Sequence, residues 1–482
     1  MTEPTAAASS GGSMTVGRMI TLIIALIAFT IPWLINFPGL SPEGHRVLSV
    51  FLLAVVLWLT EAIPLHATAV LIIFLLILFI SDRALIPLPE EYAPDAVSFG
   101  QYFATLADPI LMLFLGGFVL ANCASKYHLD KNLARVVLRP FGTSPIWIIF
   151  GLMLVTAVFS MFMSNTATAA TMMAVVLPII RTLPPGDRLA AGLALSIPFA
   201  ANLGGIGTPI GTPPNAIAVS AMFEAGYDVG FFDWMMMMLP FVIVVMVAAW
   251  LMIGWFFRSD TKEIKLQIDS KFNLEPAAII FYVTFAVTVL LWMTEALHGM
   301  ASTMVGFLPV VVLISTGVFT TKDMQSIQWH VLWLMAGGIA LGAGVRHSGL
   351  DQWMIGLVDW EQVGTLLLVA LLSIISIILS TFISNTATAN LIVPLGLTLA
   401  ASSGVAISPV EAGVFIAVSC SLAMALPVST PPNAIAYSTG VFSTRNMMIM
   451  GAMIGVVGWV IFIQFAPLVW DALGLMPEVT PQ

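Results

Sequence analysis

The sequence predicts an all-α polytopic membrane protein with about 11 transmembrane helices and two re-entrant hairpins, arranged as two inverted repeats. Three features predict this fold class: an apolar composition, apolar runs long enough to cross a bilayer, and polar motifs that occur twice in the same order. Of the 482 residues, 59% are apolar and 9% are charged. An average soluble protein is about 45–50% apolar and about 25% charged, so the composition excludes a soluble globular fold.

The two ends of the chain and one central stretch lie outside the apolar runs. Residues 1–18 are small and polar, which predicts a disordered cytoplasmic tail, and residues 19–43 predict the first transmembrane helix. Residues 258–274 predict a cytoplasmic linker, and residues 473–482 predict a tail on the outside. The net charge of −9 is dispersed along the chain. It forms no block of like charges of the kind that binds nucleic acid.

Two similar series of apolar runs lie between these segments, and we predict repeat 1 over 44–257 and repeat 2 over 275–472. Each repeat is predicted to begin with scaffold helices that carry no polar motif. The runs at 145–183 and 364–401 are too long for one crossing, and each contains the polar string SNT near its middle. Polar non-helical backbone at that depth is tolerated only inside protein or beside water. Both runs are therefore predicted to be re-entrant hairpins.

The positive residues predict the orientation in the membrane. If the N-terminus is cytoplasmic, every Lys and Arg except Arg46, Arg83 and Arg346 falls on the cytoplasmic side. An excess of positive charge on the cytoplasmic side is the usual topological signal. We therefore expect an integral protein of the cytoplasmic (inner) membrane, with its N-terminus inside and its C-terminus outside.

Four strings in the first half of the chain recur in the second half in the same order. They are WLTEA at 58–62 and WMTEA at 292–296, GG at 116–117 and 337–338, SNTATA at 164–169 and 384–389, and TPPNAIA at 212–218 and 430–436. Each predicted repeat holds five crossings and one hairpin. Because five is odd, the second copy must be inverted in the membrane. Inverted repeats with broken helices are typical of secondary transporters, which bind substrate near the midplane.

The hairpins carry the first polar motif. Ser160 precedes Ser164, Asn165 and Thr166 in one copy, and the second copy repeats this spacing. The second set is Ser380, Ser384, Asn385 and Thr386. Serines four residues apart lie on one helix face, and Ser, Asn and Thr favour turns and helix starts. A helix broken here exposes N–H groups that suit anions and C=O groups that suit cations.

The second polar motif is predicted to break the helices at 187–223 and 408–440. Gly211 and Thr212 precede two prolines in the first copy, and Ser429 and Thr430 precede two prolines in the second. Adjacent prolines remove backbone donors and clash with the preceding turn, so the helix must unwind. The freed carbonyls need partners, and a sodium ion shared with the hairpin tip would be one.

The motifs also allow purely structural interpretations. One SNT string could be a hydrogen-bonding contact between helices, and one Pro-Pro pair could be a kink, but paired copies in inverted repeats favour a functional site. Other polar or sulfur-containing residues are interpreted as interfacial, packing or buried groups. They are Glu61, Glu295, Asp108, His330, Cys123, Cys420 and the lipid-facing run Met235–Met238.

The paired SNT and TPPN strings resemble those of the divalent anion/sodium symporter family of di- and tricarboxylate carriers, over about 19–470 of this chain. The resemblance implies a homodimer in which a mobile transport part moves against a scaffold by an elevator-type mechanism. It implies that substrate carboxylates are bound by Asn165, Thr166, Thr212, Asn385, Thr386, Thr430 and Pro431. It also implies two sodium sites. The first comprises Ser160, Ser164, Asn165 and Gly211, and the second comprises Ser380, Ser384, Asn385 and Ser429, the last through its backbone carbonyl.

The charges of the motifs are consistent with at least two bound sodium ions. None of the four strings contains Lys, Arg or His, and an uncompensated dianion in a low-dielectric site is very costly. The expected function is sodium-coupled symport of C4-dicarboxylates such as succinate, malate and fumarate. The alternatives are a sulfate, oxyanion or tricarboxylate carrier, or a sodium-independent dicarboxylate exchanger. An enzyme is not expected, because neither H-E-x-x-H nor G-x-S-x-G occurs.

Overall fold

A computed structural model describes residues 16–89, 91–92, 96–264, 272–357, 364–401 and 407–474, and over these residues every regular element is a helix. Most of the predicted N-terminal tail, most of the predicted outside tail and much of the predicted linker lie outside the described residues. Residues 16–18 of the predicted disordered tail are instead helical, because the first helix begins at Val16. The described part contains eight stretches long and apolar enough to cross a membrane, and four shorter apolar helices. The prediction of an all-helical membrane protein is therefore confirmed.

The helices of the first half of the chain occur in an order that the second half repeats. The first half contains α1 (Val16–Leu34), α2 (Pro42–Thr60), α3 (Leu65–Phe79), α4 (Phe99–Ala104), α5 (Pro109–Lys126), α6 (Leu129–Leu138), α7 (Pro145–Phe162), α8 (Asn165–Ile180), α9 (Arg188–Gly205), α10 (Pro213–Glu224) and α11 (Phe231–Phe256). The second half contains α12 (Pro276–Met293), α13 (Glu295–His298), α14 (Ser302–Ser315), α15 (Thr321–Met324), α16 (Trp329–His347), α17 (Leu350–Ile355), α18 (Thr365–Phe382), α19 (Asn385–Ala401), α20 (Pro409–Leu422), α21 (Pro431–Ser438) and α22 (Thr444–Leu473). The helices α5 to α11 correspond in order to α16 to α22.

The repeated glycine pair lies where helices from the two halves cross. A Cβ on Gly116 of α5 would lie 1.7 Å from the carbonyl oxygen of Gly306 in α14. A Cβ on Gly337 of α16 would lie 2.5 Å from the Cα of Ala69 in α3. Only a residue without a side chain permits backbones to approach this closely. The pairs α5–α14 and α3–α16 are therefore equivalent contacts, each joining one half of the chain to the other.

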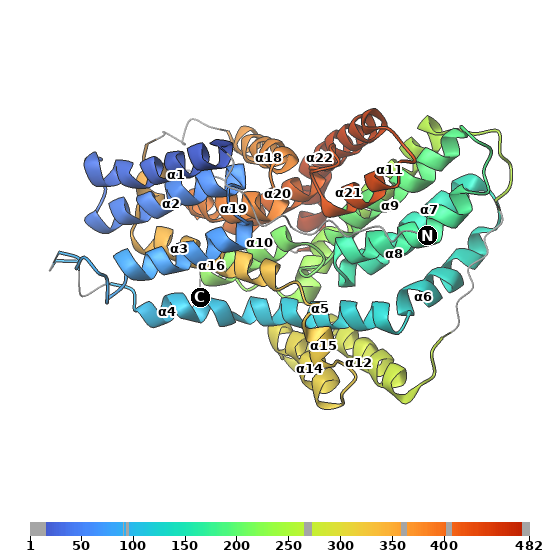
Figure 1. Ribbon diagram of the computed structural model, residues 1–482, viewed down its shortest axis with the longest axis horizontal. Helices are drawn as coiled ribbons and strands as arrows, with labels where there is room; N and C mark the ends of the chain where they lie inside the picture. The colour runs from blue at the N-terminus through green and yellow to red at the C-terminus, as the bar shows by residue number, and fades with distance from the viewer. Residues whose placement is uncertain are drawn as a thin grey trace.

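The helices form an elongated molecule (Figure 1). We call α1–α5 with α12–α16 the frame group, and α7–α11 with α18–α22 the site group. Within the site group the hairpin helices pack on the broken helices. In the first half α7 and α8 both contact α9, and in the second half α18 and α19 both contact α20. The frame helices α12, α14 and α15 project on one side beyond α5 (Figure 1). The helix α16 contacts α10 and α19 and so joins the two groups.

Large apolar side chains on the outside of the helices indicate which surface faces lipid. Leu26 of α1 is 60% exposed, Ile243 of α11 is 57% exposed and Leu290 of α12 is 60% exposed. Contiguous apolar surface of this kind is rare on soluble monomers. The methionine run was predicted to face lipid, and this prediction is wrong: Met235, Met237 and Met238 are buried against neighbouring helices. Their position on α11 places them between α9 and α22.

Candidate functional site

A cavity of about 660 Å³ lies where the two hairpin tips and the two broken helices meet. Its volume is within the usual range of small-molecule sites. The predicted substrate contacts all line it: Asn165, Thr166, Thr212, Asn385, Thr386, Thr430 and Pro431. Of the residues implied for the sodium sites, those that line it are Ser164, Asn165, Gly211, Ser384, Asn385 and Ser429. Residues about 220 positions apart in sequence therefore lie together.

The first hairpin tip is a break between α7 and α8. The helix α7 ends at Phe162, and Met163 is extended. Ser164 is the N-cap of α8, and its hydroxyl accepts a hydrogen bond from the backbone N–H of Ala167. The second tip breaks at the same place, since α18 ends at Phe382 and α19 begins at Asn385. The Ser164 hydroxyl thus satisfies a backbone donor that the start of α8 would leave unpaired.

Behind the first tip, Ser160 lies beside two oxygen acceptors. Its Oγ is 2.5 Å from Asn165 Oδ1 and 2.7 Å from the carbonyl oxygen of Ala201 in α9. Ser160 is fully buried and does not line the cavity itself. A serine hydroxyl has one proton, so it can satisfy only one of these acceptors. The three oxygens form a compact cluster with a surplus of lone pairs.

The second tip has the same oxygen cluster. Ser380 Oγ is 2.7 Å from Asn385 Oδ1 and 2.8 Å from the carbonyl oxygen of Cys420 in α20. Ser380 is also fully buried. Because the same three contacts recur, Cys420 corresponds to Ala201 in the other half of the chain. Both cysteines are buried and free, and Cys420 contributes its backbone rather than its sulfur.

The first broken helix unwinds between Gly205 and Pro213, as the paired prolines predict. A Cβ on Gly211 would lie 2.3 Å from the carbonyl oxygen of Gly205, so this segment closes tightly on itself. The Nδ2 of Asn215 lies within hydrogen-bond distance of the carbonyl oxygens of Gly205, Ile206 and Thr208, at 3.0, 3.2 and 2.8 Å. One amide therefore holds the unwound turn in place.

The second broken helix is held in the same way. The Nδ2 of Asn433 is 2.9 Å from the carbonyl oxygens of both Met424 and Leu426. Ser429 donates its hydroxyl proton to the carbonyl oxygen of Thr381 in the adjacent tip, at 2.9 Å. The side chain of Ser429 is therefore engaged in joining the broken helix to the hairpin.

Sequence reasoning missed several polar residues at the cavity. Asn202 of α9 lines it, as does Gln328, whose Nε2 donates to Ser164 Oγ at 3.0 Å. The only sequence signal for Asn202 is an amide within an otherwise apolar and glycine-rich stretch. Among residues interpreted as interfacial, Glu61 and His330 line the cavity, whereas its described lining does not include Asp108 or Glu295.

Comparison with known proteins identifies the family of this chain. The family model described as "Citrate transporter" matches residues 55–418. The chain belongs to the citrate transporter family. It is 31% identical over 493 residues to the sodium-dependent dicarboxylate transporter SdcS of Staphylococcus saprophyticus, covering 94% of this chain and 91% of that protein. It is also 31% identical over 485 residues to the protein of the same name from Staphylococcus aureus strain USA300, covering 93% and 90%. The resemblance to divalent anion/sodium symporters is thereby confirmed.

Two solved transporter structures share the fold of this citrate transporter family member. The YdaH transporter of Alcanivorax borkumensis aligns with a TM-score of 0.54 and 13% identity, over 78% of this chain and 88% of that one. MtrF of Neisseria gonorrhoeae aligns with a TM-score of 0.55 and 12% identity, over 95% of both chains. At these identities the likeness concerns the fold alone.

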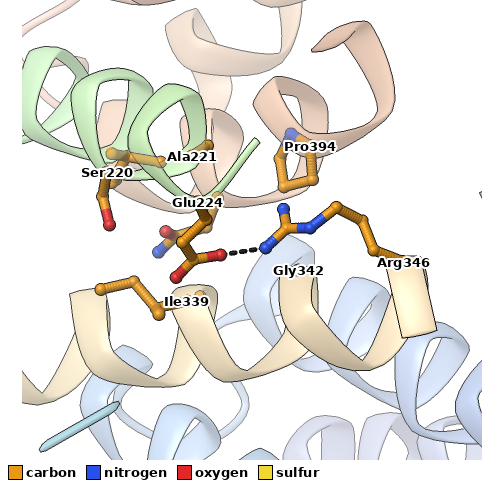
Figure 2. Close-up of a pocket in the computed structure, with 10 residues that line it drawn as sticks. Ser220, Ala221, Glu224, Ile339, Gly342, Arg346 and Pro394 are labelled. Carbon is orange, nitrogen blue, oxygen red and sulfur yellow. Dashed lines mark hydrogen bonds and ion pairs between the residues drawn. The ribbon is translucent and has the colours of Figure 1, made fainter. Parts of the chain in front are cut away.

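A second polar cluster of this family member lies outside the cavity. Arg346, in the last turn of α16, forms an ion pair with Glu224 at the end of α10 (Figure 2). Their side chains are 24% and 21% exposed. Ser220 Oγ and Asn390 Oδ1 line the same small pocket and are buried without a hydrogen-bond partner. The ion pair joins the frame group to the site group.

Proposed function

We propose that this protein is a sodium-coupled symporter of C4-dicarboxylates such as succinate, malate and fumarate. The proposal rests on one observation above all: neither lysine nor arginine occurs among the described residues that line the cavity. His330 is the only described lining residue that can become positively charged, and it lies outside the four motif strings, where a dianion would be bound by hydroxyl, amide and backbone N–H groups. These groups carry only partial charge, so mobile cations must neutralise the substrate.

The oxygen clusters behind the hairpin tips are the proposed sites of these cations. Each places a serine hydroxyl, an asparagine side-chain oxygen and a backbone carbonyl oxygen together. Hard cations such as sodium favour oxygen ligands of this kind. Ser164 and Gly211 would complete the first site, and the backbones of Ser384 and Ser429 the second. Two sodium ions would balance the two charges of the substrate.

Asn165 and Asn385 are proposed to connect the two ligands. An asparagine amide has an oxygen that accepts and a nitrogen that donates. In each tip the amide oxygen belongs to the oxygen cluster while the residue lines the cavity. Its nitrogen can therefore donate to a substrate carboxylate while its oxygen ligates sodium. This dual contact would make binding of one ligand favour binding of the other.

The names of the homologous carriers support both sodium dependence and a dicarboxylate substrate. We further propose a homodimer in the cytoplasmic membrane, with the N-terminus inside, and an elevator-type motion of the site group. The cavity reaches the exposed residues Thr60 and Glu61 at the end of α2. In the proposed orientation this end of α2 is cytoplasmic, so the structure corresponds to an inward-facing state.

The direct test is uptake of radiolabelled succinate into proteoliposomes that contain the purified protein. Uptake should require an inward sodium gradient, and its dependence on sodium should have a Hill coefficient above one. Equal uptake in sodium and choline buffers would overturn symport and favour the sodium-independent exchanger. Competition by unlabelled citrate and sulfate then separates a dicarboxylate carrier from a tricarboxylate or oxyanion carrier. Recovery of succinate chemically unchanged tests our proposal that the protein transports its substrate without catalysing a reaction.

A further inference from the structure

We propose that Asn202 is a positioning residue that fixes the Thr430 hydroxyl as a hydrogen-bond donor to a substrate carboxylate. Asn202 lies on α9, and Thr430 lies in the second broken helix, 228 positions away. Both line the cavity and both are buried, with 3% of their surface exposed. This inference rests on the proposed function and refines it. The hydrogen-bond network around the Thr430 hydroxyl leaves it free to act only as a donor.

The network begins at Asn433, whose amide can adopt only one orientation. Its Nδ2 is 2.9 Å from two backbone carbonyl oxygens, those of Met424 and Leu426. A flipped amide would place its oxygen against these two acceptors without a proton between them. The Oδ1 of Asn433 must therefore point toward Asn202, at 3.2 Å from its side chain.

The orientation of Asn202 follows from that of Asn433. Because an oxygen acceptor faces it, Asn202 must present its Nδ2. This nitrogen has two protons. One is donated to Asn433 Oδ1 at 3.2 Å, and the other is donated to Thr430 Oγ1 at 3.1 Å.

The Thr430 hydroxyl consequently receives two hydrogen bonds. Its Oγ1 accepts from Asn202 Nδ2 and from the backbone N–H of Asn433, which is 3.4 Å away. A threonine hydroxyl has two lone pairs and one proton. With both lone pairs occupied, only the proton remains available. Across the described residues, no recorded hydrogen bond uses Thr430 Oγ1 as a donor, and the residue lines the cavity. A carboxylate is the acceptor that suits a preoriented hydroxyl donor.

The broken helix of the first half lacks this arrangement. Thr212 occupies the position of Thr430, but its side chain makes no capping hydrogen bond. Since Cys420 corresponds to Ala201, the residue that corresponds to Asn202 is Ser421, and its hydroxyl donates to Ala417 of its own helix at 3.1 Å. The Oδ1 of Asn215, unlike that of Asn433, is buried without a partner. Of the two broken helices, only the second therefore presents a threonine hydroxyl that is fixed in this way.

A double-mutant cycle tests whether Asn202 acts through Thr430. The proteins are the wild type, Asn202→Ala, Thr430→Val and the double variant, with Ser421→Ala as the matched control at the equivalent position. Each single cavity variant should raise the half-saturating succinate concentration about tenfold, as expected for the loss of one hydrogen bond to a charged group. The double variant should also show about a tenfold rise, because both changes remove the same contact. The control should leave this concentration unchanged.

Several results would overturn the proposal. An increase of about a hundredfold in the double variant means that the two residues act independently. If Asn202→Ala leaves the half-saturating succinate concentration unchanged, or lowers only the thermal stability and the maximal rate, then Asn202 only packs the core. If Asn202→Ala does not fold, Asn202→Asp retains the shape. The carboxylate created in this variant cannot donate to Thr430 Oγ1 and instead accepts the Thr430 hydroxyl proton. That proton is then not available to succinate, so the affinity for succinate should fall further. Sodium-independent uptake by the wild type contradicts the proposed function instead, and the cycle remains measurable on that uptake.

Discussion

Replacing the buried serine of either hairpin separates sodium ligation from simple packing. Ser160 Oγ lies 2.5 and 2.7 Å from two oxygen acceptors, and Ser380 Oγ lies 2.7 and 2.8 Å from two others. One hydroxyl proton cannot satisfy both acceptors at either position. Sodium at the cluster would ligate all three oxygens and remove the surplus of lone pairs. We therefore expect Ser160→Ala and Ser380→Ala each to weaken sodium binding.

The expected magnitude follows from the one oxygen that each variant removes. An interaction of a polar group with a charge contributes about 1.5–3 kcal/mol, and about 1.4 kcal/mol corresponds to a factor of ten in affinity. These energies correspond to a rise of about ten- to a hundredfold in the half-saturating sodium concentration of each variant. If the serine only hydrogen-bonds its neighbours, the loss is one neutral hydrogen bond, about 1 kcal/mol of unfolding free energy. Sodium ligation therefore predicts a changed sodium dependence, whereas hydrogen bonding alone predicts only a changed stability.

The assay is sodium-dependent succinate uptake in proteoliposomes, measured at saturating succinate. Ser196→Ala is the matched control, because Ser196 is a fully buried serine of α9 that donates only within its helix, to the carbonyl oxygen of Leu193 at 2.8 Å. The control should keep the wild-type sodium dependence. Reduced thermal stability with an unchanged sodium dependence in both Ser160→Ala and Ser380→Ala would refute the assignment of the oxygen clusters.

Three further predictions concern charge and topology. Asn165→Asp or Asn385→Asp should nearly abolish succinate uptake while the protein elutes normally in gel filtration, because a negative charge then lies beside the bound anion; normal uptake by both would remove the tips from the site. Arg346→Gln should lower the free energy of unfolding in detergent by about 1–2 kcal/mol more than the double variant Glu224→Gln/Arg346→Gln does, since it leaves a partly buried carboxylate unpaired; equal losses would contradict this. A cysteine at Ser144 should react with an impermeant thiol reagent only from the cytoplasm, and one just before α18 only from outside; labelling of both from one side would contradict the inverted topology.

Composition, repeated motifs and helix breaks could be predicted from sequence because each depends on local chemistry. Apolar content determines that the helices lie in lipid. The two tips break at Ser164 and Ser384, and the two broken helices resume at Pro213 and Pro431, where the residue types favour these backbone changes. That the SNT and TPPN strings lie at one cavity could also be predicted, from their duplication. Equivalent segments of inverted repeats are expected to meet at the repeat interface.

The remaining contacts could not be predicted because they join residues far apart that share no periodicity. Asn202 contacts a residue 228 positions away, and Gln328 contacts one 164 positions away. Neither position is part of a duplicated string, so the repeat gives no signal for it. The methionine run was misassigned for a related reason. Apolar side chains on a helix of a membrane protein face either lipid or protein, and hydropathy alone does not distinguish these environments.

The polar contacts at the two ends of α16 constrain how the site group can move. At the first end Gln328 donates to Ser164 of the hairpin tip, and at the other end Arg346 pairs with Glu224 of α10. Both contacts join the frame group to the site group. The motif residues that line the cavity lie within the site group, whereas Glu61, Gln328 and His330 line it from the frame group. If the site group moves as one body, the motif residues keep their relative geometry while both contacts at α16 must break. The cost of breaking them would be compensated only if the other state offers new partners. If the site group moves in this way, Gln328 and Arg346 bias the equilibrium toward the present state, and Gln328 does so through Ser164, a residue of the proposed first sodium site.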